Sequence, residues 1–122
     1  MATGSEIKAR LQSYIDNLAS GDVDKVMAHY AEGATCEDPV GGTIYRGLEE
    51  IRGFYTQAML GQTLRIEPLT PIVSTTTNYD AMGARVATRR GVLEFVETQR
   101  FDDAGKIVEM RAYYDPADFK PA

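Results

Sequence analysis

The sequence predicts an α+β fold in which three helices are followed by a mostly antiparallel sheet that curls over them and leaves a pocket between. Two patterns predict it: apolar residues recur at helical spacing up to Met59, and from Thr63 onward they alternate as in strands. Because 122 residues can bury a sufficient core, we expect a single domain spanning residues 1–122.

The first helix is predicted from its cap and its apolar face. Residues 3–6 match a capping box, so the helix should begin near Ser5 and end before Gly21. Tyr14 adjoins the apolar face, so its ring is expected to be buried while its hydroxyl needs a partner. The face itself consists of Ile7, Leu11, Ile15 and Leu18.

The second helix is predicted to follow at once, capped by Asp22 and ended by Gly33. With the first helix it should form a helical hairpin. His29 falls off its apolar stripe and is expected on the surface. The stripe consists of Val23, Val26, Met27 and Tyr30.

The stretch 34–42, ATCEDPVGG, is a strand-like run that ends in two carboxylates. Pro39 biases Asp38 toward an extended backbone, so the carboxylate should end a strand and point in a fixed direction. An Asp-Pro pair can also simply begin a turn. If Asp38 lies at the rim of a pocket, its carboxylate would be held in one orientation and could act as a general base.

A third helix is predicted from Leu48 to Met59, after a short extended piece at 43–45, with Gly61 as its stop. Tyr55 lies on its apolar face and is a third inward-leaning tyrosine, after Tyr14 and Tyr30. The face consists of Leu48, Ile51, Phe54, Tyr55, Ala58 and Met59.

Alternation in the second half predicts the strands. Pro68 and Pro71 demote the first of them to an edge or kinked strand, and 103–105 reads as a hairpin turn. The last strand carries a row that would suit an apolar pocket wall, namely Val108, Met110, Ala112 and Tyr114. The predicted strands are 63–75, 80–90, 92–101 and 106–114.

Glu97 is the most informative anomaly, because it shares a strand face with Leu93, Phe95 and Phe101. An ionised carboxylate there would lose several kcal/mol of hydration, so without a cation it should stay protonated and able to donate a hydrogen bond. Two alternatives remain open. Gln99 could mark this face as wet, or Arg85, Arg89 or Arg111 could pair with Glu97.

Composition narrows the partners. The formal net charge of −5 without a basic run argues against nucleic acid or an anionic membrane surface and favours a small neutral molecule. One cysteine, Cys36, and one histidine make a metal site improbable, and no cofactor motif is present. The sequence contains neither a leader-like segment nor a long apolar stretch, so we expect a cytoplasmic protein.

A carboxylate at a strand end, a carboxyl in an apolar wall and several buried phenols suit enolisation. Removing a proton next to a carbonyl needs a base near the carbon and donors that meet the developing oxyanion. Two acids in different environments can divide these roles, the wetter one ionised and the drier one neutral.

The residues resemble the bacterial Δ5-3-ketosteroid isomerases, whose cone-shaped α+β fold is shared with nuclear transport factor 2. The spacing from Tyr30 to Asp38-Pro39 is the most specific part of the resemblance. The matching segments are Tyr14, 27–39 (MAHYAEGATCEDP), 53–55 (GFY), 81–82 (AM), 100–102 (RFD) with Gly105, and 110–114 (MRAYY).

The resemblance implies a role for each matched position. Asp38 would be the base that moves a proton between two carbons of a 3-oxo-Δ5-steroid, and Tyr14 would donate to the enolate oxygen. Tyr30 and Tyr55 would support Tyr14. Phe54, Met82, Met110 and Tyr114 match pocket-lining positions. The resemblance also implies a homodimer through the outer sheet face, where Val92 and Val96 are available.

Two positions depart from the family pattern. Glu97 stands where the family has an aspartic acid as second oxyanion donor, and Tyr114 stands where it has a tryptophan. The extra methylene moves the carboxyl by on the order of 1 Å unless the backbone or rotamer compensates. We hypothesise that Glu97 still donates as a neutral acid.

The same fold hosts other functions, so the site must decide. A scytalone-type dehydratase would need pocket histidines, and an epoxide hydrolase would need an Asp-Arg-Asp arrangement that Arg85 or Arg111 could complete. A polyketide cyclase also uses an acid and an enolate. From another class, a binding protein could use the same pocket. Asp38 and Tyr14 facing one cavity, with Asp38 free of arginine, would favour the isomerase.

Overall fold

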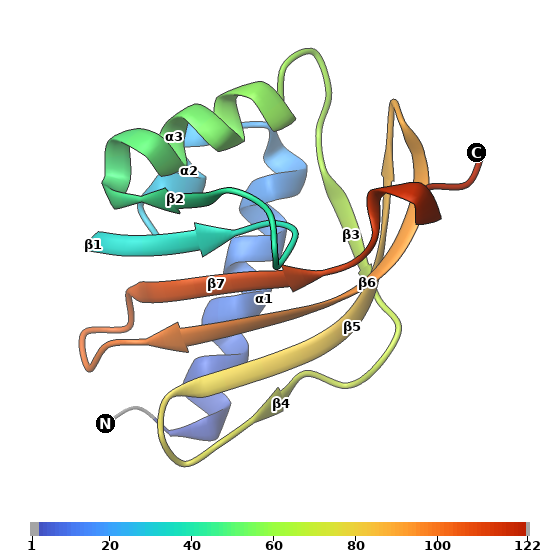
Figure 1. Ribbon diagram of the computed structural model, residues 1–122. Coiled ribbons are helices and arrows are strands. Elements are labelled where there is room, and N and C mark those ends of the chain that lie inside the picture. Colours follow the sequence, from blue (N-terminus) through green and yellow to red (C-terminus); the bar gives the residue numbers. More distant parts are fainter. Residues whose placement is uncertain (1–2, 122) are drawn as a thin grey trace.

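The computed structural model describes residues 3–121, and its sheet and helices confirm the predicted α+β fold (Figure 1). The three helices come first, interrupted by two strands, and five strands and a 3₁₀ turn follow. The helices are α1 (Gly4–Ser20), α2 (Val23–Met27), α3 (Gly47–Ala58) and the turn η1 (Pro116–Asp118). The strands are β1 (Tyr30–Glu37), β2 (Ile44–Arg46), β3 (Arg65–Pro68), β4 (Val73–Ser74), β5 (Tyr79–Thr88), β6 (Gly91–Phe101) and β7 (Ile107–Tyr113).

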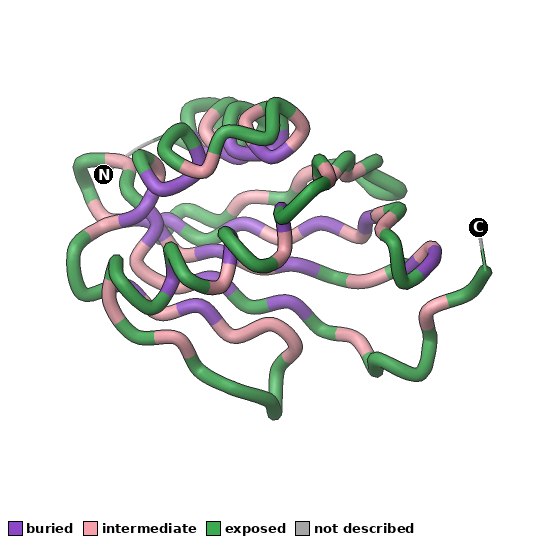
Figure 2. The backbone as a smooth tube through the Cα atoms, turned by 90° about the horizontal axis from the view of Figure 1, so that it is seen from above, coloured by how far each residue is buried: buried purple, intermediate pink, exposed green. Residues whose placement is uncertain are grey.

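The strands form one mixed sheet in the order β2-β1-β7-β6-β5-β3, with β4 also paired to β5. Only β1 and β7 run parallel among the described strand pairs. The long strands curve, and α1 crosses behind them while α3 lies over the end where β1 and β2 pair (Figure 1). Seen from above, buried residues concentrate where the helices face the sheet (Figure 2). The core therefore lies between one helical layer and the concave face of the sheet.

The caps of α1 form as predicted. The Thr3 hydroxyl accepts from the backbone N–H of Glu6 at 3.2 Å. Gly21 adopts a left-handed backbone, φ 76°, and its N–H donates to the carbonyl of Leu18. Since a residue without Cβ takes this conformation at little cost, Gly21 ends the helix and allows the sharp turn into α2. Ile7, Leu11, Tyr14, Ile15 and Leu18 are the buried residues of α1.

The second helix is shorter than predicted. Asp22 caps it, its side chain accepting from the N–H of Lys25, but the helix ends at Met27 and Tyr30 begins β1. Pairing with β7 competes with the helix there: the N–H of Ile107 donates to the carbonyl of His29 at 2.7 Å. Gly33 lies inside β1 with φ 77°, where the register with β7 shifts.

His29 also departs from its expected surface position, because it is only partly exposed. Its Nε2 lies 2.7 Å from the side-chain nitrogen of Asn17, and its ring meets the edge of Tyr14 at 6.0 Å between centroids. Burial lowers the pKa of His29, and the nearby charge of Lys106 acts in the same direction. His29 therefore supports the outer side of the Tyr14 ring.

The prolines act as predicted on the third strand segment. The predicted strand 63–75 splits into β3 at the sheet edge and the short β4, with Pro71 in the bend between them. The turn at 103–105 joins β6 to β7 as expected.

The set of inward-facing residues on the last strand, β7, differs from the prediction at one position. The register between β6 and β7 shifts between Arg100, which pairs with Glu109, and Phe101, which pairs with Ile107, so Val108 is an extra residue. Ile107, at 1% exposure, takes the inward place predicted for Val108, while Met110 and Ala112 stay buried as the alternation predicts.

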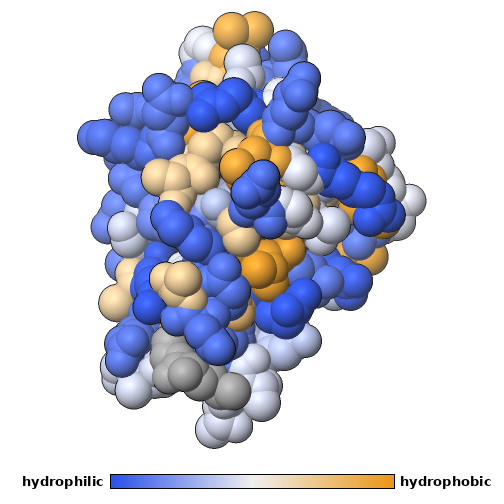
Figure 3. All heavy atoms as spheres, turned by 90° about the vertical axis from the view of Figure 1, so that its left-hand side faces the viewer, coloured by the Kyte–Doolittle hydropathy of each residue, from blue (hydrophilic) through white to orange (hydrophobic). Residues whose placement is uncertain are grey.

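Hydrophilic side chains predominate on the face shown in Figure 3, where apolar residues form small separate groups. In residues 3–121 no helix combines the length and apolar character that crossing a membrane would need.

Candidate active site

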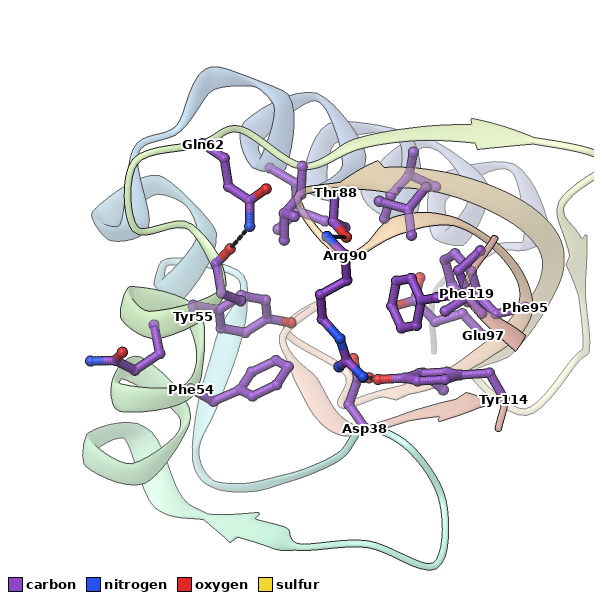
Figure 4. A pocket seen from close by; sticks show the side chains of 18 of the residues that line it. Asp38, Phe54, Tyr55, Gln62, Thr88, Arg90, Phe95, Glu97, Tyr114 and Phe119 are labelled. Atoms are coloured by element: carbon purple, nitrogen blue, oxygen red, sulfur yellow. Dashed lines mark hydrogen bonds between the residues drawn. The ribbon is translucent and has the colours of Figure 1, made fainter. Parts of the chain in front are cut away.

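A cavity of about 300 Å³ opens between α1, α3 and the concave side of the sheet, within the size range of ligand pockets. Tyr14, Asp38 and Glu97 all line it, although they come from a helix, a strand end and the middle of another strand. Figure 4 shows Phe54 and Tyr55 of α3 on one side and Asp38, Tyr114, Phe95 and Glu97 on the other. The fold thus brings together two acids and a phenol that are distant in the sequence.

Asp38 follows the last residue of β1, and two hydrogen bonds from backbone N–H groups hold the loop that it begins. The N–H of Val40 donates to the carbonyl of Ala112 at 2.8 Å, and the N–H of Gly41 donates to the Glu37 carboxylate at 3.0 Å. The Tyr114 hydroxyl donates to Asp38 Oδ1 at 2.5 Å. Within the described residues, Asp38 has no ion pair, so its carboxylate is oriented by a neutral donor.

The electrostatics of Asp38 suit a base. Burial raises its pKa above the ordinary value, and the hydrogen bond from Tyr114 opposes that rise because it stabilises the ionised form. A carboxylate of raised pKa binds a proton from carbon more readily than an exposed one.

Three tyrosines form a buried hydrogen-bonded chain. The hydroxyl of Tyr55 lies 2.5 Å from that of Tyr14 and 2.6 Å from that of Tyr30. Burial raises the pKa of all three well above the ordinary value, so they stay protonated. If Tyr30 donates to Tyr55 and Tyr55 to Tyr14, the Tyr14 proton is left for a ligand in the cavity.

Glu97 is 2% exposed and lines the cavity, and it forms no ion pair with a cationic side chain of residues 3–121. Two of the three candidates pair elsewhere: Arg85 pairs with Glu94 and Glu67, and Arg111 pairs with Glu37 and Glu109. The third, Arg89, lines the same cavity but forms no ion pair with Glu97. Burial first, and then the charge of Asp38, raise the pKa of Glu97 to about 8. At neutral pH Glu97 is therefore mostly a neutral acid that can donate a hydrogen bond.

The predicted lining positions fall into two groups. Phe54 and Tyr114 line the cavity, and Tyr114 is also the hydrogen-bond donor to Asp38. Met82 and Met110 are 2% and 1% exposed, and they lie in the core cluster rather than on the cavity wall. Across β6, Met82 pairs with Glu97 and Met110 pairs with Gln99.

Sequence reasoning missed the residues at the mouth of the cavity. Arg90 stands over the ring of Phe119, 4.4 Å from its centroid, and both line the cavity with Gln62 and Thr88. The backbone of Lys120 pairs with Val92 in both directions and holds this tail in place. The available signal for Phe119 was that it is the only large apolar side chain after Tyr114 in the sequence.

The particular residues considered for two alternative chemistries lie outside the cavity wall, although two other arginines, Arg89 and Arg90, line it. His29 does not line the cavity, so a dehydratase based on pocket histidines finds no imidazole there. Arg85 and Arg111 are engaged by surface carboxylates. In residues 3–121 no group of His, Cys, Asp and Glu residues could hold a metal ion.

Glu97 should cost stability at alkaline pH. Its pKa is raised from an ordinary 4.5 to about 8, so from about pH 4.5 upward the folded state binds a proton that the unfolded state has lost. The contribution of protonated Glu97 to the stability of the folded state is therefore fully present below pH 4.5 and is lost as pH rises toward 8. We expect Glu97→Gln to raise the free energy of unfolding at pH 8 by on the order of 3 kcal/mol, with little change at pH 4. Urea unfolding at both pH values measures this, with the exposed Glu49→Gln as control, and equal stability of Glu97→Gln and the wild type at pH 8 would contradict it.

Taken together, the fold and the cavity define a small α+β domain whose concave sheet face holds a base, a neutral acid and a chain of phenols. Comparison with known proteins agrees with this class. A family model for the SnoaL-like domain matches residues 11–110. The chain is 36% identical over 118 residues to a steroid Delta-isomerase from Nocardioides simplex, covering 93% of this chain and 94% of that protein. The protein belongs to the SnoaL-like family, within the nuclear transport factor 2-like fold.

A solved structure supports the fold. The epoxide hydrolase/cyclase-like enzyme SalBIII, described for its role in pyran ring formation in polyether salinomycin, matches with a TM-score of 0.81 at 23% identity. The match covers 93% of this chain and 94% of that chain. At this identity it is evidence for the fold alone.

Proposed function

We propose that residues 1–122 form one ketosteroid isomerase-like domain that converts a 3-oxo-Δ5-steroid to the conjugated 3-oxo-Δ4-steroid. The observation that carries this proposal is that Asp38, Tyr14 and Glu97 line one cavity, while no arginine of residues 3–121 forms an ion pair with Asp38. The similarity to a steroid Delta-isomerase over nearly the whole chain supports the same reading.

The proton transfer follows from the placement of Asp38. Its carboxylate removes a proton from the carbon between the ketone and the double bond, and the electron pair of that C–H bond moves toward the ketone oxygen to give a dienolate. Asp38 then returns the proton two carbons further along, which restores the ketone and leaves the double bond conjugated with it. Because one group takes and returns the proton, the reaction needs no cofactor.

Tyr14 and Glu97 are the donors for the dienolate oxygen. Both are protonated at neutral pH, and both are almost fully buried, so a hydrogen bond from either to a developing charge is strong. The apolar majority of the lining, including Leu93, Phe95 and Ala112, suits a flat hydrocarbon skeleton.

The direct test is the ultraviolet absorbance of 5-androstene-3,17-dione mixed with the protein, since the conjugated enone absorbs where the starting ketone does not. Appearance of the enone well above the buffer rate is expected. If the steroid binds, as judged by quenching of tyrosine fluorescence, and no enone appears, the protein is a binder or another enolate enzyme.

The homodimer stays a prediction. Val96 and Tyr113 pair across β6 and β7 on the outer sheet face and are 47% and 42% exposed, which leaves apolar area for a second chain. Sedimentation equilibrium is expected to give twice the mass of 13.4 kDa, whereas the mass of one chain would remove this proposal.

A further inference from the structure

A second group of buried polar side chains lies behind the cavity, next to Glu97. Gln99 follows Glu97 by two positions on β6, so both side chains are on the inner face. Asp80 of β5 pairs directly with Gln99 across the sheet. The three residues are between 1% and 3% exposed. Opposite residues of neighbouring strands hold their Cβ atoms about 5 Å apart, so these side chains form one continuous cluster.

Five buried polar atoms of this cluster lack a well-formed hydrogen bond within residues 3–121, although the side chain and the backbone of Gln99 lie close enough to Glu97 and Asp80, respectively, to lower their pKa values. The five atoms are Oε2 of Glu97, both side-chain polar atoms of Gln99 and both carboxylate oxygens of Asp80. Leaving a buried polar atom unpaired costs about 1–3 kcal/mol, so such groups are kept only where they gain partners or serve a function. Each of these three groups has in its neighbour the donor or acceptor that it lacks.

The side-chain amide of Gln99 sets the donor-to-acceptor order of the hydrogen bonds in this cluster. The Gln99 side chain carries an acceptor at one end and donors at the other, so it can link two carboxyl groups only if one donates and the other accepts. Burial raises the pKa of Asp80 to about 7, so below that pH Asp80 is mostly a neutral acid and can be the donor. Glu97 accepts at Oε2, which leaves its own proton directed at the cavity that it lines.

We propose that Gln99 is a positioning residue that orients protonated Glu97, and that Asp80 holds Gln99 in place. In this chain Asp80 donates to the Gln99 carbonyl oxygen, the Gln99 amide donates to Glu97 Oε2, and Glu97 donates to the ligand. It would be the counterpart, on the sheet side, of the tyrosine chain that supports Tyr14 on the helix side. The role of Glu97 as donor rests on the proposed function.

The ionisable groups that act on Glu97 come from several elements. Burial raises the pKa of Glu97 most, the charge of Asp38 at the end of β1 raises it further, and Asp80 on β5 adds to the rise once it is ionised, whereas the Gln99 side chain lowers it. The α1 side of the cavity faces Glu97 with Tyr14, whose pKa responds to the Glu97 charge. A change at Gln99 therefore has a predictable sign at Glu97.

The first test is Gln99→Met, which keeps the length of the side chain and removes both ends of the amide. We expect turnover to fall about tenfold, the rate equivalent of one lost hydrogen bond, with KM little changed. The pKa of Glu97 should rise further, because the donor that stabilised its ionised form is gone. Mere loosening of the core would admit water and move that pKa down instead. The matched control is Thr98→Val. Thr98 lies between Glu97 and Gln99 on β6 but faces the opposite side of the sheet, so this change should alter neither turnover nor the pKa of Glu97.

The second test compares two replacements of Asp80. Asp80→Asn keeps a donor for Gln99 and should keep turnover within about twofold, whereas Asp80→Leu removes the donor and should match the loss in Gln99→Met. The double variant Asp80→Leu with Gln99→Met should be no slower than either single variant, because each substitution alone already breaks the same series of hydrogen bonds to Glu97. Full additivity of the two losses, or equal effects of Asn and Leu, would overturn the proposal.

A measurement without turnover separates this proposal from the proposed function. The carboxyl carbon of Glu97 is followed by ¹³C NMR during a pH titration of the whole protein labelled at Glu, its signal being assigned by its absence in Glu97→Gln. A higher titration midpoint in Gln99→Met supports the positioning role even if no steroid is turned over. An unchanged or lower midpoint overturns it even if the isomerase activity is present.

Discussion

Asp38→Asn is expected to lower the rate of enone formation by about two to four powers of ten, the contribution of a positioned general base. The amide has nearly the same shape and can still accept from Tyr114, so the site should keep its geometry while losing the group that takes the proton. Steroid binding should change little, because the cavity wall is mostly apolar. The loss should therefore appear in kcat rather than in KM.

The control for Asp38→Asn is Glu32→Gln, an exposed acid on the same strand, β1, which should leave the rate unchanged. The acid limb of the pH–rate profile gives an independent check. Burial raises the pKa of Asp38, so activity should appear only as pH rises through a value above that of an ordinary aspartate. An Asp38→Asn protein with wild-type kcat would show that another group is the base.

Replacing Glu97 tests the donor that departs from the family pattern. Glu97→Leu should lower kcat by about two to three powers of ten, which is the loss typical of one oxyanion donor. Glu97→Gln should keep most of the rate, because its amide can still donate from nearly the same place. The order wild type, Gln, Leu is the expected result, measured by enone absorbance at pH 7.

The pH dependence of the same variants shows which form of Glu97 works. With the pKa of Glu97 raised to about 8, the neutral donor is lost as pH rises through that value, so the wild-type rate should fall above about pH 8. Glu97→Gln has no proton to lose there and should keep its rate through that range. If the alkaline limb persists in Glu97→Gln, or if Glu97→Leu is as fast as the wild type, Glu97 is not the donor.

Glu97 illustrates a conflict between stability and function. An apolar side chain or a glutamine at this place would remove the stability cost expected at alkaline pH. The buried acid is instead kept neutral by the same burial that makes it costly, and this is the form that can donate. The tyrosine chain does not carry this cost, because phenols stay protonated at neutral pH without a shift.

Much of the fold could be read from local patterns. The cap at Thr3, the stop at Gly21 and the alternation through Glu97 depend on a few neighbouring residues, so the sequence alone predicts α1 and the inward side of β6. The second helix was predicted too long because its end is decided by pairing of β1 with β7, far along the chain. The extra residue at Val108 likewise depends on the register with β6.

The candidate site divides in the same way. The sequence by itself determined that Asp38 ends a strand and that Glu97 faces the apolar side, because both follow from local backbone preferences. Only the tertiary structure decided that the two share a cavity with Tyr14, that Tyr114 donates to Asp38, that Met82 lies behind the wall, and that Asp80 stands beside Gln99. These facts depend on long-range register and on the amount of surrounding apolar mass, which fix solvation and therefore the pKa values.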